Sequence, residues 1–169
     1  MLKDDIFQET DAYTTSDASY ETERNKPMPN IIHGTIQSAI NGQLRMHYCN
    51  EYNFPGELSL KTTPPSTPDI CIYPKKKLDI KTVTAKESEP PLTTIEILSP
   101  SQSLNDLMHK AWDLYFPLGV KSAWIVVPEF KAIHVLLPDD QSILVNSGTL
   151  TDPATGIQIL VEKVFEDLL

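Results

Sequence analysis

Cysteine, glycine and long apolar runs are all scarce in this sequence of 169 residues. The two cysteines, Cys49 and Cys71, form no CxxC pair and match no metal-ligand spacing, so we expect buried, reduced thiols. Six glycines against 14 prolines favour stiff connections between short elements over flexible linkers. No apolar run approaches the roughly 20 residues that span a bilayer, and the N-terminus carries no apolar signal core. These absences predict a cytoplasmic protein with no membrane contact.

Basic residues are also few, since 14 lysines and arginines stand against 23 acidic residues and give a net charge of −9. Such a chain repels polyanions on average, which argues against a general nucleic-acid coat. It does not exclude an enzyme that reaches DNA through a bound divalent cation and a local basic patch. The run Lys75, Lys76 and Lys77 is the best candidate for such a phosphate-contacting patch, although a run of this kind is usually a solvated loop.

The length of the chain fits one domain, because two would leave each with a thin core. Residues 1–28 are polar and acidic, and we expect them to form a separate segment, helical or irregular, that packs on the domain or on a partner. The domain itself is predicted over residues 29–169. Its first helix has an apolar residue at every fourth position, from Ile32 to Leu44, and Asn30 is a suitable N-cap.

The rest of the chain alternates between short β-prone runs and one further helix. An amphipathic pattern from Leu104 to Tyr115 predicts a helix that is capped by Ser101 or Ser103 and ends at Pro117 and Gly119. Strands are predicted at residues 57–60, 69–73, 93–98, 122–127, 132–137 and 142–145, and a strand or short helix at 157–165. This order predicts an α/β domain with a mixed central sheet flanked by helices.

Two of the predicted strands each carry one carboxylate in apolar surroundings. Asp69 opens one run, and Glu96 lies between Ile95 and Ile97 in another. A carboxylate inside a core strand costs several kcal/mol of desolvation unless it is paired or binds a cation. Alternatively, Asp69 caps a turn after Pro68 and Glu96 pairs with a lysine. Together, the two acids are better explained as a hard-oxygen site for Mg²⁺ or Mn²⁺.

Lys110 lies on the helix that follows the Glu96 strand, and Asp106 precedes it by four residues. A surface ion pair between these two side chains is the ordinary interpretation of this spacing. The alternative is that Lys110 points back at the sheet and helps to orient or deprotonate a water molecule.

Several motifs resemble those of the Uma-two family of putative endonucleases, which belongs to the PD-(D/E)XK superfamily. The most specific of them lies between Pro91 and Pro128 and contains Glu96-Ile97-Leu98-Ser99-Pro100-Ser101, Asp106, Lys110, Tyr115 and Trp124-Ile125-Val126. Pro68-Asp69-Ile70 looks like the first catalytic strand of the family. A weaker match, Tyr20-Glu21-Thr22-Glu23 with His33, looks like its N-terminal motif. The resemblance covers about residues 20–137.

The resemblance implies a restriction-endonuclease-like fold, with Asp69 and Glu96 as ligands of Mg²⁺ or Mn²⁺. The superfamily lysine would stand two positions after Glu96, where this chain has Leu98, and Lys110 takes its role. Glu21 or Glu23 would add a further carboxylate. His33 is either a capping or packing residue or a group at the mouth of the cleft, and Gln102 is a candidate neighbour of the metal.

The function that follows is metal-dependent hydrolysis of DNA phosphodiester bonds, with the enzyme expected as a homodimer. A nuclease-like fold that serves as a binding or dimerisation module without turnover is the alternative. A plain structural domain, in which Asp69 and Glu96 lie apart as ion-pair residues, is the third interpretation.

Overall fold

A six-stranded mixed sheet forms the centre of the computed structural model, which describes residue 22 and residues 26–169. Its strands lie in sequence order: β1 (Tyr52–Asn53), β2 (Ile70–Pro74), β3 (Thr93–Ile97), β4 (Ser122–Val127), β5 (Ala132–Leu136) and β6 (Ser142–Val145). β3 and β4 are parallel, and the other neighbours are antiparallel. The predicted mixed α/β sheet is therefore confirmed. The predicted N-terminal segment lies mostly outside the described residues.

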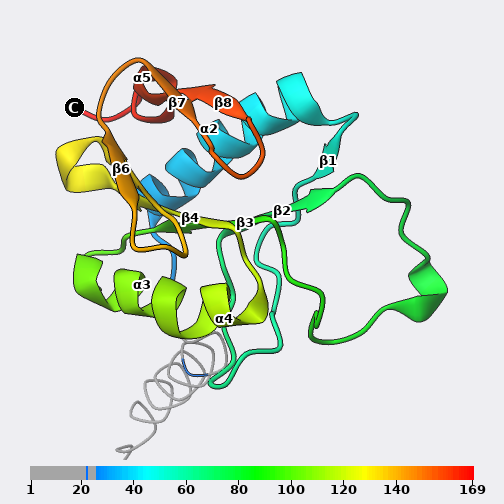
Figure 1. The fold of residues 1–169 in the computed structure, drawn as a ribbon. Helices are drawn as coiled ribbons and strands as arrows, with labels where there is room; N and C mark the ends of the chain where they lie inside the picture. Colours follow the sequence, from blue (N-terminus) through cyan, green and yellow to red (C-terminus); the bar gives the residue numbers. More distant parts are fainter. Residues whose placement is uncertain (1–21, 23–25) are drawn as a thin grey trace, which may run out of the picture.

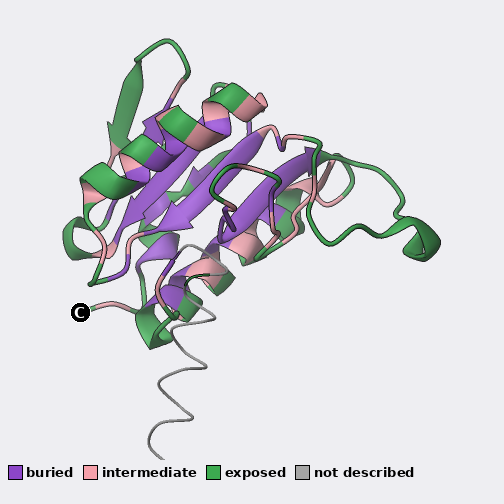
Figure 2. Ribbon diagram, turned by 90° about the horizontal axis from the view of Figure 1, so that it is seen from below, coloured by how far each residue is buried: buried purple, intermediate pink, exposed green. Residues whose placement is uncertain are grey.

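Helices cover both faces of the sheet (Figure 1). One face carries α2 (Ile31–Tyr48), the hairpin of β7 (Thr149–Thr151) and β8 (Gln158–Leu160), and α5 (Val161–Val164). The other carries a continuous helical segment made of α3 (Leu104–Lys110), the π-helical turn η2 (Ala111–Tyr115) and α4 (Phe116–Leu118). Two short 3-10 turns, η1 (Ile80–Thr82) and η3 (Pro128–Phe130), lie in the connections. Figure 2 shows the buried strands between these layers.

The apolar stripe of α2 begins one turn later than its spacing predicts. Ile36, Ile40 and Leu44 are fully buried, whereas Ile32 is 46% exposed and His33 is buried in the first turn. The Asn30 side chain accepts a hydrogen bond from the His33 backbone N–H at 2.9 Å, which confirms the predicted N-cap. The cap thus fixes the start of the helix and directs the His33 imidazole toward the sheet.

The strand predicted at residues 57–60 is wrong. The chain forms only isolated bridges there, between Gly56 and Ile70 and from Leu60 to Ser66 and Glu87. Glu57 has a φ of 54°, a left-handed conformation that interrupts the alternation of a strand. The irregular segment instead brings the Glu57 side chain close to the start of β2.

The second helix ends where Pro117 and Gly119 predicted, since Leu118 is its last residue and Gly119 is its C-cap. A proline has no N–H and its ring crowds the carbonyl four residues earlier, which here belongs to Asp113 in the π-helical turn. The chain then leaves the helix at Gly119, whose φ of 117° is left-handed. A Cβ atom at Gly119 would lie 3.1 Å from the Pro90 ring, so the close approach also requires glycine. Ser103 is the N-cap of α3.

Candidate active site

Asp69 and Glu96 come from neighbouring strands and share one face of the sheet. Asp69 immediately precedes β2, and Glu96 lies within β3. The register pairs Ile70 with Ile95, so its continuation by one residue places Asp69 opposite Glu96. Burial and the nearby Glu96 carboxylate both raise the pKa of the Cys71 thiol, which lies in the core cluster under α3. The two predicted acids therefore lie on the α3 side of the sheet.

The Asp69 carboxylate is fully buried and both of its oxygens accept hydrogen bonds. Oδ2 accepts from the Ile97 backbone N–H at 2.7 Å, and Oδ1 contacts His33 Nε2 at 2.9 Å and the Lys26 ammonium. Burial is the largest influence on the pKa of Asp69 and raises it, but His33 and Lys26 together outweigh burial and hold the pKa below its ordinary value. Asp69 is therefore ionised at neutral pH.

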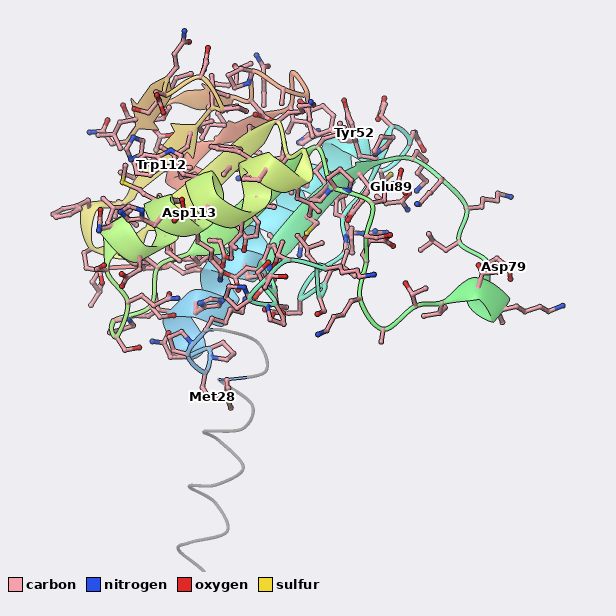
Figure 3. The ribbon with its side chains drawn as sticks, turned by 60° about the horizontal axis from the view of Figure 1, so that its bottom comes forward. Met28, Tyr52, Asp79, Glu89, Trp112 and Asp113 are labelled. Carbon is pink, nitrogen blue, oxygen red and sulfur yellow. The ribbon has the colours of Figure 1, made fainter. Side chains whose placement is uncertain are left out.

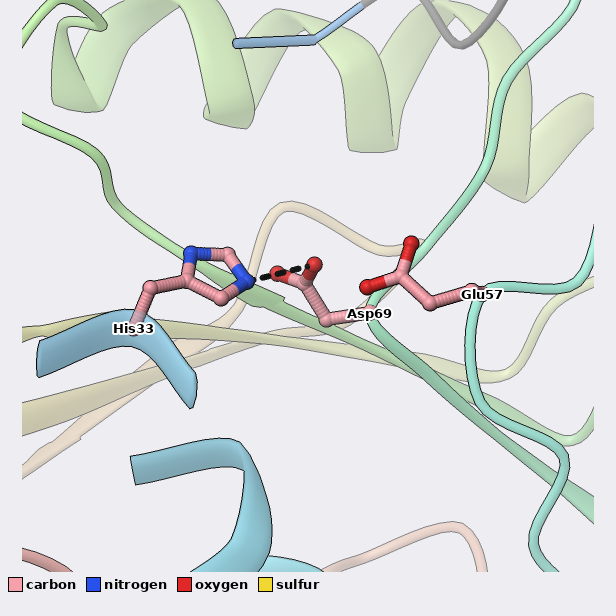
Figure 4. Close-up of side chains that lie close together, drawn as sticks. All are labelled: His33, Glu57 and Asp69. Carbon is pink, nitrogen blue, oxygen red and sulfur yellow. Dashed lines mark hydrogen bonds and ion pairs between the residues drawn. The ribbon is translucent and has the colours of Figure 1, made fainter. Parts of the chain in front are cut away.

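His33, Glu57 and Asp69 form a compact group of metal-ligating side chains (Figure 4). One ligand atom from each lies within 4.8 Å of the others. The Lys26 ammonium also lies 3.2 Å from Glu57 Oε2. Backbone contacts hold the group together, because the Glu57 N–H donates to the Asp69 carbonyl at 3.1 Å and Gln37 Nε2 donates to the same oxygen at 2.9 Å.

Glu96 is held by two side chains from the helical layer. Its Oε1 lies 2.9 Å from Lys110 Nζ and accepts a hydrogen bond from the Tyr115 hydroxyl. Burial, and then the Glu96 charge, raise the pKa of Tyr115 well above its ordinary value, so the hydroxyl keeps its proton and donates. The Lys110 ammonium is buried and close to Glu96 without forming a directed hydrogen bond to any described residue.

The π-helical turn explains why Lys110 and Tyr115 reach the same oxygen. The Phe116 N–H donates to the Ala111 carbonyl, five residues earlier. In a turn closed between residues five apart, such residues lie one above the other, whereas an α-helix would rotate them apart. Lys110 and Tyr115 are themselves five residues apart, so the wide turn places both against Glu96.

Lys110 does not form the surface ion pair that its spacing from Asp106 suggested. Asp106 completes a capping box, in which the Ser103 and Asp106 side chains each accept from the other residue's backbone N–H at 3.1 Å. Among the ion pairs of the described residues, Lys110 appears with Glu96. Of the two interpretations of Lys110, the structure therefore shows the one in which its side chain points back at the sheet, where it pairs with Glu96.

The remaining predicted residues fall into three groups. Glu21 and Glu23 lie outside the described residues. Gln102 accepts from the Ser99 backbone N–H at 3.2 Å, and it lines a surface pocket of about 300 Å³ together with Lys110. Lys75, Lys76 and Lys77 are exposed and follow the far end of β2, away from Asp69.

Comparison with protein families gives a match over residues 21–164 to Uma2, described as "Putative restriction endonuclease". The chain belongs to the Uma2 family. Its fold matches the crystal structure of a putative nuclease belonging to DUF820 from Anabaena variabilis, with a TM-score of 0.70, 21% sequence identity and 85% of each chain covered. Comparison with curated proteins gives no match. No helix among the described residues is long and apolar enough to cross a membrane.

Three residues at the centre of this Uma2 chain were not predicted as site residues: Lys26, Glu57 and Tyr115. Tyr115 carried a signal, because it stands five residues after Lys110 and four residues before the helix-ending glycine. Glu57 was assigned to a strand, and only its left-handed backbone turns it toward Asp69. Lys26 precedes two prolines in a segment without periodicity, and 43 residues separate it from Asp69 in the sequence. No local pattern therefore predicted the contact between the two side chains.

The residues present fit a divalent cation. Carboxylate oxygens are the preferred ligands of Mg²⁺ and Mn²⁺, and the group offers two carboxylates and one imidazole nitrogen within ligand distance of one another. The Lys26 ammonium already contacts both carboxylates, so a positive charge is stable at this position. Glu96 Oε2 has no hydrogen-bond partner among the described residues, whereas Oε1 is held by Lys110 and Tyr115.

Proposed function

We propose that this chain is a divalent-metal-dependent nuclease that hydrolyses phosphodiester bonds of DNA. The observation that carries the proposal is the pair of buried carboxylates, Asp69 and Glu96, at opposed positions of adjacent strands, with the Lys110 ammonium beside Glu96. Membership in a family described as "Putative restriction endonuclease" and the fold shared with a putative nuclease support it.

Asp69 and Glu96 are the proposed ligands of Mg²⁺ or Mn²⁺. Among the described residues, His33 and Glu57 are the side chains that lie within ligand distance of Asp69, and this group does not include Glu96. When bound, the cation would supply positive charge at the scissile phosphate and lower the pKa of a water molecule. The protein's part is to fix the ligands. The Ile97 N–H holds one Asp69 oxygen, and the Tyr115 hydroxyl holds one Glu96 oxygen.

Lys110 supplies the second positive charge of the proposed mechanism. Its ammonium is buried against Glu96, and its side chain also lines the surface pocket that contains Gln102. A cation in water-excluded surroundings stabilises negative charge that develops on an attacking oxygen or on the phosphate more strongly than a solvated one does. Lys110 is therefore proposed to stabilise the charge of the transition state without itself binding the metal.

The DNA backbone is proposed to contact Lys75, Lys76 and Lys77 on an exposed segment that projects from the sheet. Figure 3 shows this segment with Asp79 near its tip, away from the main body of the molecule. The five residues of β2 separate the lysines from Asp69, a span of about 17 Å at roughly 3.3 Å per residue. Replacement of all three lysines by alanine should weaken DNA binding and reduce its salt dependence, measured by fluorescence anisotropy at several salt concentrations.

A homodimer is part of the same proposal. β6 lies at one edge of the sheet, and its Leu144 side chain is 66% exposed. An exposed edge strand with apolar side chains is suited to pairing with a second copy. Light scattering of the wild type and of Leu144→Lys would test it: we expect a dimer that the charged side chain dissociates, and a monomeric wild type would contradict it.

One observation favours a second candidate function, a nuclease-like binding module without turnover. Each acid already has a lysine beside it, Lys26 at Asp69 and Lys110 at Glu96. Buried carboxylates that are neutralised by lysines also occur as ion pairs with a purely structural role. The module would keep the fold and the DNA contacts but would cleave nothing in the presence of metal.

Cleavage of supercoiled and linear DNA in Mg²⁺ or Mn²⁺ separates the two functions. Wild type, Asp69→Ala and Glu96→Ala are compared with Glu166→Ala, which removes an exposed acid from a surface ion pair with Lys163. We expect the wild type and Glu166→Ala to cut and the other two variants to be inactive. No cleavage by any protein would favour the module, and equal cleavage by all four would indicate a contaminant.

A further inference from the structure

We propose that Lys26 is an internal counter-ion of the two carboxylates Asp69 and Glu57, and that a divalent cation binds to them by exchange with the Lys26 ammonium. The inference rests on the metal site of the proposed function and extends it to the way in which the site is loaded. It concerns a residue that lies before α2, in the stretch of residues 26–30, which has no helix or strand.

Burial first distinguishes Lys26 from its neighbours. Lys26 is 7% exposed, whereas Met28, Pro29 and Asn30, which follow it, are exposed. A buried lysine is rare because removal of the ammonium from water is costly unless carboxylates compensate for it. The Lys26 side chain is therefore buried against Asp69, which is itself fully buried, although the three residues at positions 28–30 are exposed.

The ammonium contacts the same oxygens that a cation would use. Lys26 Nζ contacts Asp69 Oδ1 and lies 3.2 Å from Glu57 Oε2. Asp69 Oδ1 also contacts His33 Nε2 at 2.9 Å, so all three members of the ligand group surround the position beside the ammonium. A divalent ion bound to these oxygens would lie so close to the ammonium that their repulsion excludes joint occupancy.

The segment that carries Lys26 is built to allow the exchange. Pro27 and Pro29 favour an extended backbone at Lys26 and Met28, and residues 26–30 have no helix or strand before α2 begins at Ile31. Withdrawal of Lys26 therefore requires rotation in a short extended segment and leaves the sheet and α2 intact. The charge of the Asp69 and Glu57 carboxylates would then be balanced in part by the ammonium in one state and fully by the divalent cation in the other.

Isothermal titration of Mn²⁺ into the full-length chain tests the exchange. Lys26→Met keeps most of the side-chain length and removes the charge, and Lys26→Arg keeps the charge. Lys163→Met is the matched control, because it removes the same charge and one ion pair from the surface. We expect Lys26→Met to bind Mn²⁺ roughly tenfold or more tightly than the wild type, as when the competent form makes up about a tenth of the molecules. Lys26→Arg and Lys163→Met should show no such gain.

The outcomes separate the exchange from the function on which it rests. Equal Mn²⁺ affinity of wild type and Lys26→Met would overturn the exchange and leave the nuclease proposal standing. Absence of Mn²⁺ binding in both proteins would overturn the exchange together with the metal site. If Lys26→Met is unfolded without metal, we expect Mn²⁺ to restore its circular-dichroism spectrum, and failure at saturating Mn²⁺ counts against the exchange.

Hydrogen exchange supplies a readout that is independent of affinity. Mg²⁺ should increase amide exchange at Lys26, Met28 and Asn30 in the wild type, because the ammonium no longer anchors the segment. The increase should be absent in Asp69→Asn. Unchanged or slower exchange of these amides in a Mg²⁺-loaded wild type would contradict the proposal.

Discussion

Two aspartates, Asp69 and Asp152, are both fully buried, yet their surroundings differ in kind. Asp69 has a lysine ammonium, an imidazole and a second carboxylate next to it, contributed by segments far apart in the sequence. Asp152 accepts hydrogen bonds from the Thr93 hydroxyl at 2.9 Å and the Thr155 hydroxyl at 2.7 Å. Burial alone therefore does not identify a functional acid, but the charges around it do.

The two aspartates also lie on opposite layers of the molecule. Successive side chains of β3 lie on opposite faces of the sheet. The odd-numbered positions, Thr93 among them, lie on the face that packs with α2 and the β7–β8 hairpin. Asp152 accepts from its own turn as well, since the Ala154 N–H lies 3.4 Å from Oδ1. Asp152 thus joins the hairpin to the sheet, whereas Asp69 gathers groups that could serve a cation.

Replacement of each aspartate by asparagine should give the largest difference between the two regions. Asp69→Asn should reduce metal-dependent DNA cleavage by at least about a hundredfold, the size of losing a principal electrostatic group from an active site. Asp152→Asn should destabilise the protein by about 1–3 kcal/mol through imperfectly matched hydrogen bonds and should leave cleavage intact below its unfolding temperature. Cleavage rates and urea denaturation measure both effects, and comparable activity of the two variants would erase the distinction.

Lys110→Met should have the largest effect on stability within the acidic site. It leaves Glu96 buried without its cation, and loss of one partner of a buried ion pair costs about 3–5 kcal/mol. In a Glu96→Gln background the same change should cost much less, because no charge remains to be compensated. Urea denaturation of the four proteins gives this coupling, and additive effects would show that the pair is not coupled.

Tyr115→Phe and Thr93→Val remove comparable hydroxyls, one from each region. Each hydroxyl donates to a buried carboxylate, so each loss should cost about 1.5–3 kcal/mol. Only Tyr115→Phe should also lower DNA cleavage, because Glu96 loses the group that orients it. Equal cleavage by both variants at a temperature where both are folded would show that Tyr115 has no role in cleavage.

The loss of folding stability at low pH should give the smallest difference between the Asp69 and Asp152 regions. The pKa of Asp69 is lower in the folded chain than its ordinary value of about 3.9, so the ionised form stabilises the fold above that pH. This stability is lost as the pH falls below about 4 toward the folded pKa. Asp69→Asn should therefore show a shallower loss of stability with acid than wild type or Asp152→Asn, and identical slopes would contradict the ion pairs at Asp69.

The part of the site that lies in regular elements was predictable from sequence. Asp69 immediately precedes one apolar strand, Glu96 lies inside another, and the α3 pattern places Lys110 on the helix after β3. The register of β2 and β3 then brings the acids to one face. Apolar periodicity and the alternation of side chains along a strand are local properties of the sequence. A few neighbouring residues are therefore enough to predict which side chains share a face of the sheet.

The other part depends on contacts that no local pattern encodes. Lys26 reaches Asp69 from 43 residues away, and Glu57 turns toward it through a left-handed backbone. The π-helical turn that aligns Lys110 with Tyr115 is also invisible to a search for α-helical periodicity. Irregular backbone and long-range ion pairs are set by tertiary packing, which explains why the pocket's counter-ion and its third carboxylate were not predicted.

Anomalous diffraction from crystals soaked in Mn²⁺ tests whether Asp69 anchors a cation in a catalytic site. We predict a Mn²⁺ peak in contact with the Asp69 carboxylate, with the Lys26 ammonium displaced from it. An Asp69 that keeps its contacts with Lys26 and His33 at saturating Mn²⁺, with no peak beside it, would contradict this prediction.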